Sequence, residues 1–173
     1  MDIKEFWKLI ETSNENSEIR ASTIVAHLKE YSPEQIVAFE IILRQYIIEA
    51  DDFKIMAAAK IIQESVSDDS YLYFRCWLIS QGEKTFLGAL KNPDTLADKV
   101  NRDSETDFED LIYVSTDAFR SKTGKSEEDE TFPRDVAYSK GLDYDFGAPP
   151  TKGTDWTIDE LPKLYPKLWA IFN

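Results

Sequence analysis

The sequence predicts an all-α fold in which a single multi-helix domain carries an irregular C-terminal arm. Apolar residues recur at the helical period through most of the first 119 positions, and capping residues stand before several of these segments. A chain of 173 residues, 42% of them hydrophobic, can build one substantial core and is short for two ordinary domains. We expect a helical core domain over residues 1–124. Residues 125–173 should form an irregular acidic arm and a closing helix packed on the same domain.

The segment from Ser67 to Gly82 is predicted to be the central helix. Ser67 can cap its first turn, and Gly82 can end it in the left-handed conformation. Its apolar and aromatic residues cover every face of a helix: Tyr71, Leu72, Tyr73, Phe74, Cys76, Trp77, Leu78 and Ile79. A helix that is apolar all round is buried by its neighbours. We therefore expect other helices to surround this one.

Four helices are expected before it, and the first three lie within residues 3–50. The first begins after Asp2, places Ile3, Phe6, Trp7 and Ile10 at the helical period, and ends in the polar stretch 12–17. The second places Ile19, Ile24, Val25 and Leu28 on its buried side. The third is long and starts at the capping box Ser32-Pro33-Glu34-Gln35. Within it, Glu40 and Arg44 should form an i,i+4 ion pair on the outside.

Further helices are expected on both sides of the central one. Asp51 and Asp52 favour a helix start before residues 53–64. Residues 84–90 form a short helix with Phe86, Leu87 and Leu90 buried, Asn92-Pro93 ends it, and residues 94–100 add a turn or two. Ser104 can cap a helix that ends near Gly124.

The arm over residues 125–154 shows no sustained helical or alternating pattern, so we expect it to be irregular. It is too apolar for a free linker and should lie over the helical body. A capping box at Thr157–Glu160 and a proline at Pro166 indicate the closing helix.

The acidic balance of the chain restricts its partners. There are 33 Asp and Glu against 20 Lys and Arg, a formal net charge of -13, which repels nucleic acids and anionic membranes. We expect neither as a partner. No stretch approaches the roughly twenty apolar residues that span a bilayer. A lone cysteine, Cys76, excludes an intramolecular disulfide and suits the cytoplasm.

The central helix carries one group of candidate site residues. Asp68 and Asp69 complement the helix dipole, and they could also contact a divalent cation or a substrate. Arg75 lies among aromatic residues and needs an acidic partner if it is buried; Asp68, Asp69 or an acid of a neighbouring helix could supply it. We favour a structural ion pair over an anion-binding arginine. Trp77 is interpreted mainly as core, with ligand binding as the alternative.

Other catalytic patterns are weak. Cys76 and His27 are the sole thiol and the sole imidazole, and Cys76 lies in an apolar segment where a thiol acts as a small hydrophobe. Neither a nucleophile elbow nor a glycine-rich phosphate loop is present. We predict no cofactor and no metal site, since Asp143 and Asp145 lack the rest of a calcium loop.

The arm carries the candidate partner-binding residues. Its aromatic residues alternate with acidic ones at Tyr138, Asp143, Tyr144, Asp145 and Phe146. Aromatic side chains anchor protein interfaces, and carboxylates attract basic surfaces. The pattern favours capture of a basic protein.

Residues 3–124 resemble the bacterial domain of unknown function 4240 family. The resemblance rests on four groups of residues. Near the start these are Phe6-Trp7 with Leu9-Ile10, and then Tyr31-Ser32-Pro33-Glu34-Gln35-Ile36 with Phe39. The third group is Ser67-Asp68-Asp69 followed by Tyr73-Phe74-Arg75 and Trp77-Leu78-Ile79 with Gln81-Gly82, and the fourth is Ala89-Leu90 and Asn92-Pro93-Asp94 with Leu96-Ala97-Asp98. It implies a mainly helical bacterial protein and no particular activity. It carries nothing over to the arm at residues 125–154.

Three hypotheses for function remain. We favour a non-catalytic acidic module that binds a basic protein, as an immunity protein or an antitoxin-like inhibitor would. The alternatives are an enzyme that uses Asp68, Asp69 and Arg75 around a metal or a phosphorylated small molecule, and a scaffold or regulatory module.

Overall fold

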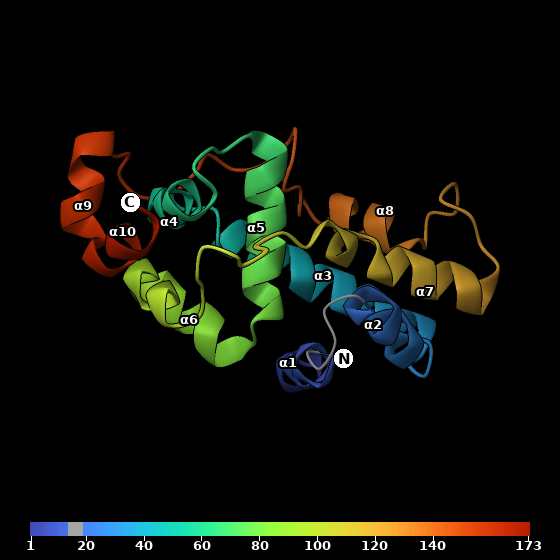
Figure 1. Ribbon diagram of the computed structural model, residues 1–173. Helices are drawn as coiled ribbons and strands as arrows, with labels where there is room; N and C mark the ends of the chain where they lie inside the picture. The colour runs from blue at the N-terminus through green and yellow to red at the C-terminus, as the bar shows by residue number, and fades with distance from the viewer. Residues whose placement is uncertain (14–18) are drawn as a thin grey trace. The chain divides into compact units, whose positions relative to one another are not determined.

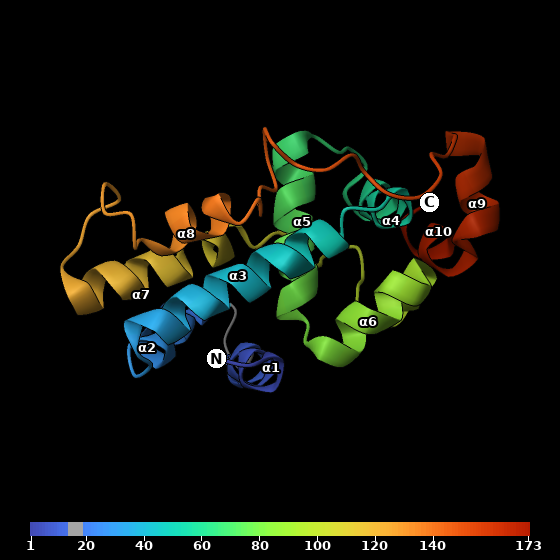
Figure 2. The same cartoon turned by 180° about the vertical axis from the view of Figure 1, so that it is seen from behind.

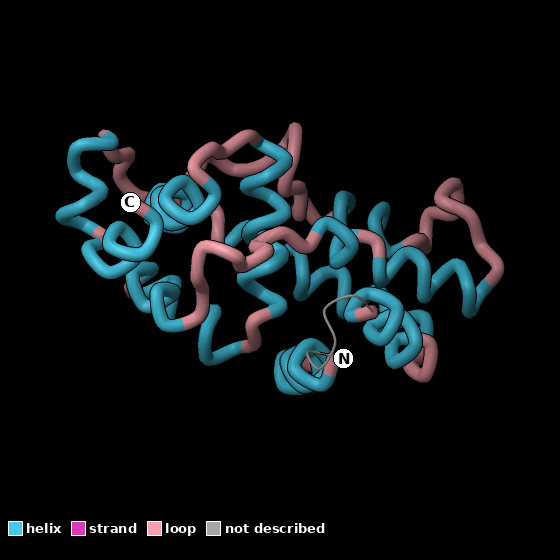
Figure 3. Tube along the Cα trace, in the orientation of Figure 1, coloured by secondary structure: helices cyan, strands magenta, loops and turns pink. Residues whose placement is uncertain are grey.

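The computed structural model describes residues 1–13 and 19–173, and these residues confirm the all-α fold (Figures 1 and 3). No β-strand occurs among them, and one isolated β-bridge joins Asp52 to Lys152. Residues 14–18, which include most of the polar stretch expected to end the first helix, lie outside the described residues. None of the described helices is long and apolar enough to cross a membrane.

The chain forms two compact units, and each is built from two separate stretches of sequence. The first unit holds Met1–Ile48 and Glu109–Pro149, and the second holds Glu49–Phe108 and Pro150–Asn173. The described helices of the first unit are α1 (Ile3–Thr12), α2 (Arg20–Leu28), α3 (Pro33–Glu49, which ends at the first residue of the second unit), the 3-10 turn η2 (Glu109–Ile112), α7 (Val114–Thr123) and α8 (Pro133–Ser139). Those of the second are α4 (Phe53–Gln63), α5 (Asp68–Ser80), α6 (Glu83–Lys91), η1 (Pro93–Asp98), η3 (Ile158–Glu160), α9 (Leu161–Leu164) and α10 (Pro166–Phe172).

Local capping fixes several of the helix starts, as the sequence predicts. The Asp2 carboxylate accepts the amide of Glu5 at 2.8 Å, and the Glu5 carboxylate accepts the amide of Asp2 at 2.8 Å. Ser32 and Gln35 exchange the same pair of hydrogen bonds at the start of α3. Each such exchange satisfies amides that the first turn of a helix leaves without partners.

Aromatic side chains of α1 and α3 build part of the core of the first unit. Phe6 packs on Phe39 with ring centroids 5.0 Å apart, and Trp7 packs on Tyr46 at 4.8 Å. The indole N–H of Trp7 donates to the Tyr46 hydroxyl at 3.1 Å, so the buried indole keeps a polar partner. α7 packs against α2 and α8, and Phe119 of α7 meets Phe132 edge to face.

Helix α5 is buried within the second unit, as predicted. Eight of its 13 residues are buried, from Tyr71 to Ser80. The Tyr71 hydroxyl lies 3.1 Å from the carbonyl oxygen of Ala50 and 3.0 Å from that of Asp52, and it accepts the Asp52 amide at 3.1 Å. These contacts join α5 to the turn before α4. The helix therefore has a structural role in its unit.

A buried carboxylate starts the last helix of the second unit. Asp94, in η1, accepts the amides of Lys167 at 3.1 Å and Leu168 at 3.0 Å. Pro166 occupies the first helical position, as predicted, and the carboxylate of a distant residue caps α10. Figure 1 shows α10 beside α4, with which it packs.

The predicted helix from Ser104 to Gly124 is wrong at its start. The Ser104 hydroxyl accepts the amide of Asn101 at 2.9 Å and closes a loop, and the amide of Phe108 donates to Tyr73 of α5 at 3.3 Å. These bonds hold the segment in a non-helical path until η2, and α7 starts at Val114. The predicted end is confirmed, since Gly124 takes the left-handed conformation at φ 70°.

Two predictions of burial and one of irregular structure are also wrong. Ile19 is 52% exposed and Leu87 is 41% exposed. In α6 the buried face carries Phe86 and Ala89, and Leu87 lies off that face. The arm contains α8, because Pro133 can occupy a first helical position and Phe132 and Ala137 are buried.

Candidate functional site

A buried charge pair in α3 forms the base of the site. The Nε atom of Arg44 lies 2.5 Å from Oε1 of Glu40, and the Ser115 hydroxyl of α7 donates to Oε2 of Glu40 at 2.5 Å. Glu40 is 1% exposed, and Arg44 and Ser115 are completely buried. The i,i+4 pair forms as predicted, but its expected place on the outside is wrong. The contact with α7 and the arm removes the pair from water.

The arm closes over the guanidinium of Arg44. The Cζ atom lies 4.5 Å from the ring centroid of Tyr138, on α8, and 4.5 Å from that of Tyr144, in the loop that follows. Its Nη1 atom donates to the carbonyl oxygen of Leu142 at 2.9 Å. Figure 2 shows α8 and the segment after it running along α3. One arginine thus holds both ends of the segment 138–144.

Electrostatics keep this arginine charged. Burial alone would lower the pKa of Arg44, but the neighbouring Glu40 carboxylate and the two tyrosines outweigh it, and the pKa lies above its ordinary value. A guanidinium stacks on aromatic faces and donates in its own plane at the same time. The charged guanidinium of Arg44 therefore holds the arm against α3 through Tyr138, Tyr144 and Leu142.

Directly after this anchor, the arm makes a tight turn. The Asp143 carboxylate accepts the amide of Asp145 at 2.9 Å and that of Gly147 at 2.8 Å. Asp145 and Phe146 lie between these two bonds. Asp145 is exposed, and the side chain of Phe146 is 102% exposed, so it contacts no other part of its unit closely. The structure therefore displays one aromatic ring and one carboxylate on a turn that a second carboxylate holds.

The five partner-binding residues predicted in the arm thus lie in one segment with three different environments. Tyr138 and Tyr144 contact Arg44, Asp143 accepts backbone amides, and Asp145 and Phe146 face solvent. Sequence reasoning missed Arg44. Its spacing from Glu40 was the available signal, and the interleaved tyrosines of the arm were the second.

The candidate residues of α5 do not form an open site. Asp68 and Asp69 are exposed in the first turn. Arg75 is 5% exposed, with Nη1 3.6 Å from Asp51 and its guanidinium over the Tyr71 ring at 4.6 Å. The predicted structural ion pair is confirmed, and the acid comes from the turn before α4.

Trp77 and Cys76 complete the buried face of the same helix. Trp77 is 6% exposed and its ring packs on Phe74 at 5.2 Å. Cys76 is completely buried, whereas His27 is exposed on α2. Within residues 1–13 and 19–173, no group of three or more His, Cys, Asp or Glu side chains is arranged to hold a metal ion.

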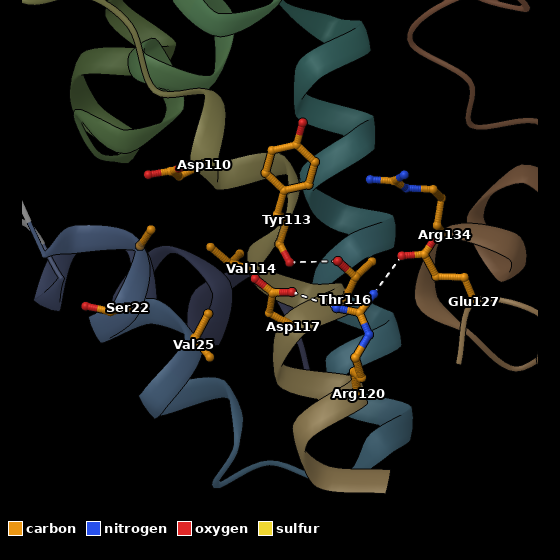
Figure 4. A pocket seen from close by; sticks show the side chains of 11 residues that line it. Ser22, Val25, Asp110, Tyr113, Val114, Thr116, Asp117, Arg120, Glu127 and Arg134 are labelled. Atoms are coloured by element: carbon orange, nitrogen blue, oxygen red, sulfur yellow. Dashed lines mark hydrogen bonds and ion pairs between the residues drawn. The ribbon is translucent and has the colours of Figure 1, made fainter. Parts of the chain in front are cut away.

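A groove of about 530 Å³ lies between α2 and α7 (Figure 4). Arg120 donates to Asp117 at 3.3 Å and to Glu127 at 2.6 Å, and both carboxylates border the groove. Val25 and Val114 supply apolar surface. Because Arg120 already pairs with two of the carboxylates, this groove offers a basic partner less uncompensated charge than the turn at Phe146 does.

Comparison with known proteins agrees with the resemblance seen in the sequence. The model of a family described as a protein of unknown function (DUF4240) matches residues 1–121, which is more than half of the chain. A search of curated proteins and a search of solved structures each found no match. The matched range includes Glu40, Arg44 and the whole of α5, and it ends before the arm. The chain belongs to the DUF4240 family.

Proposed function

We propose that this protein is a non-catalytic, acidic protein-binding module that occupies a basic surface of another protein, as an immunity protein or an antitoxin-like inhibitor does. The observation that carries the proposal is the turn at residues 143–147, where Phe146 is 102% exposed beside the exposed carboxylate of Asp145. An aromatic side chain that fills a pocket on a partner contributes a large share of binding energy. A carboxylate next to it selects a partner whose pocket has a basic rim.

The anchoring of the arm supports this role. Arg44 fixes Tyr138 and Tyr144, and Asp143 holds the turn through two amides. A loop that is ordered before it binds loses less conformational entropy on binding. In the proposal, the two tyrosines and Asp143 position the loop, and Asp145 and Phe146 make the contact.

The charge of the chain supports the choice of partner. A formal net charge of -13 attracts a cationic protein and accelerates its encounter at low ionic strength. We place the protein in the cytoplasm, since its lone cysteine, Cys76, suits a reducing compartment.

Affinity capture with matched variants tests the proposal. The immobilised full chain is incubated with lysate of its source organism, alongside Phe146→Ala and the control Ile158→Ala, which shortens another exposed apolar side chain (59%). We expect the wild type and the control to retain the same basic protein at low salt and to release it as salt rises. Phe146→Ala should lose it. Equal retention by all three proteins, or retention of nothing basic, would refute the proposal.

A second pair of variants tests the charge. Asp145→Asn removes the carboxylate beside Phe146, and Asp159→Asn removes an exposed carboxylate in η3. With the captured protein purified, the association rate should fall about equally for both, since each removes one negative charge from the net charge of -13. The dissociation rate should rise only for Asp145→Asn, because that carboxylate lies in the contact.

A further inference from the structure

A second groove lies on the first unit among α3, α7 and α8, with a volume of about 750 Å³. Its apolar lining comes from Pro33 and Val37 of α3, Phe119 of α7 and Val136 of α8. The two valines and the proline are half-buried, so they present apolar surface to solvent. A groove of this size can accept several side chains of a peptide segment.

The charges on the rim of this groove are mostly uncompensated and negative. Glu34 and Glu130 border it, both are exposed, and neither has an ion-pair partner among the residues that the structure describes. The hydrogen bond with Ser32 lowers the pKa of Glu34 below its ordinary value, which favours the charged form of this carboxylate. The one cation of the rim, Lys125, is already used, because its ammonium donates to Asp129 at 3.2 Å and to Thr131 at 2.8 Å.

This combination selects the occupant by charge. An apolar floor whose rim carries two carboxylates without ion-pair partners fits a segment whose apolar side chains point into the groove and whose lysines or arginines reach the rim. An acidic segment would place like charges together. A second copy of this chain would bring another -13 to the contact, which opposes self-association through this face.

We propose that the groove among α3, α7 and α8 is a binding surface for a basic amphipathic segment of the partner protein. It is separate from the turn at Phe146, so the partner is held at two places on the same unit. The inference rests on the proposed function for the identity of the partner. The groove itself can be tested without that partner.

The test is a titration of the full-length, ¹⁵N-labelled protein with a synthetic helical peptide of leucine and lysine, about 14 residues long, followed by NMR. A peptide with glutamate in place of every lysine is the control. We expect the leucine-lysine peptide to bind with a Kd in the micromolar range that weakens with salt, and to shift the amide signals of Val37, Phe119 and Val136. The control peptide should cause no shifts.

Matched variants locate the site. Val136→Ser should weaken binding of the leucine-lysine peptide by about fivefold, because it removes apolar contact at the floor. Val25→Ser, at a half-buried valine in the groove between α2 and α7, should not change it. Glu34→Gln with Glu130→Gln should weaken it by about fivefold in total, whereas Asp159→Asn with Glu83→Gln, which removes the same charge elsewhere, should change it less than twofold.

The outcomes separate this inference from the proposed function. Phe146→Ala should leave peptide binding unchanged, so the groove can be confirmed even if lysate capture fails. Equal binding of both peptides, shifts that cluster away from the groove, or no binding at millimolar peptide would overturn the inference. So would a dimer in sedimentation that Val136→Ser dissociates, since a second copy would then be the occupant.

Discussion

Glu40 and Arg44 form an ion pair 2.5 Å long in which neither side chain is more than 1% exposed. Two desolvated charges are stable in a protein interior only when their geometry and additional hydrogen bonds compensate the loss of water. Ser115 supplies such a bond on one side and Leu142 on the other. The pair therefore couples α3, α7 and the arm in one network.

Removal of the carboxylate alone should destabilise the protein strongly. Glu40→Ala leaves the Arg44 guanidinium buried without its counter-ion, and we expect the free energy of unfolding to fall by about 3–5 kcal/mol. Urea unfolding at neutral pH measures it. Glu49→Ala, at an exposed position of the same helix, should change stability by no more than about 0.5 kcal/mol. A similar small effect at Glu40 would show that the pair is not buried in solution.

Replacement of both charges should separate stability from the anchoring of the arm. In Glu40→Leu with Arg44→Met, two apolar side chains fill the space, and stability should return to within about 1 kcal/mol of the wild type. The arm loses the guanidinium that Tyr138 and Tyr144 hold, so limited proteolysis should cut near residue 142 faster than in the wild type. An unchanged cleavage rate in a stable double variant would contradict the anchoring role.

The contrast between α5 and this network shows how far the sequence predicts the structure. Ser67, the all-round apolar pattern and Gly82 are local signals, and they were sufficient to predict α5 and its burial. An i,i+4 pair of charges looks the same whether water or protein covers it. The residue that bonds Arg44 from the arm, Leu142, lies 98 positions away along the chain. The burial of the Glu40–Arg44 pair therefore depends on a contact with a distant part of the chain, which the periodicity of apolar residues in the sequence does not predict.

The same limit applies to the arm. Pro133 could mark a helix start, but the seven residues of α8 are too few for a periodic pattern to stand out. The alternation of Tyr138, Asp143, Tyr144 and Phe146 with their neighbours identified a segment of interest. It did not distinguish the side chains that contact Arg44 from the one that is exposed.

The cap that Asp94 provides should contribute measurably to stability. Asp94→Ala leaves the amides of Lys167 and Leu168 without their acceptor, and we expect a loss of about 1–2 kcal/mol in urea unfolding. Asp94→Asn keeps one acceptor oxygen and should lose less. Asp98→Ala, at the exposed end of η1, is the control and should be nearly neutral. If the Asp94→Ala and Asp98→Ala variants were equally stable, the cap on α10 would contribute nothing to the free energy of unfolding.

Tyr71 should make the protein less stable at alkaline pH. Burial raises the pKa of Tyr71 above its ordinary value of 10.0, even though the Arg75 charge acts in the opposite direction. The folded state therefore keeps the proton at a pH where the unfolded chain has lost it. The stabilisation is complete below pH 10 and is lost as pH rises towards the folded pKa, with a slope of up to about 1.4 kcal/mol per pH unit.

Unfolding of the wild type and of Tyr71→Phe between pH 9 and pH 12 isolates this effect. Phenylalanine cannot ionise, so the variant should lose stability less steeply above pH 10. The variant also lacks the hydroxyl contacts to Ala50 and Asp52. The loss of these contacts lowers the stability of the variant by the same amount at every pH, so it does not affect how steeply stability changes with pH. Parallel curves for the two proteins would mean that Tyr71 ionises equally in the folded and unfolded states.

Two glycines should respond in opposite ways to alanine. Gly88 lies inside α6, and a Cβ there would meet only Thr95 at 3.9 Å, an ordinary contact. Gly88→Ala should raise the free energy of unfolding by about 0.5–1 kcal/mol, because alanine loses less backbone entropy in a helix. At Gly147 a Cβ would lie 2.5 Å from Oδ2 of Asp143, the oxygen that accepts the Gly147 amide.

Gly147→Ala must therefore displace the carboxylate that holds the turn. We expect a loss of about 0.5–1 kcal/mol, the net value of one hydrogen bond, together with faster amide hydrogen exchange at Asp145 and Gly147. Because the displaced group is a side chain at the surface, the rest of the unit should remain folded. An unchanged exchange rate at both amides would show that Asp143 does not fix the turn that presents Phe146, and the preorganisation in the proposed function would then have no structural basis.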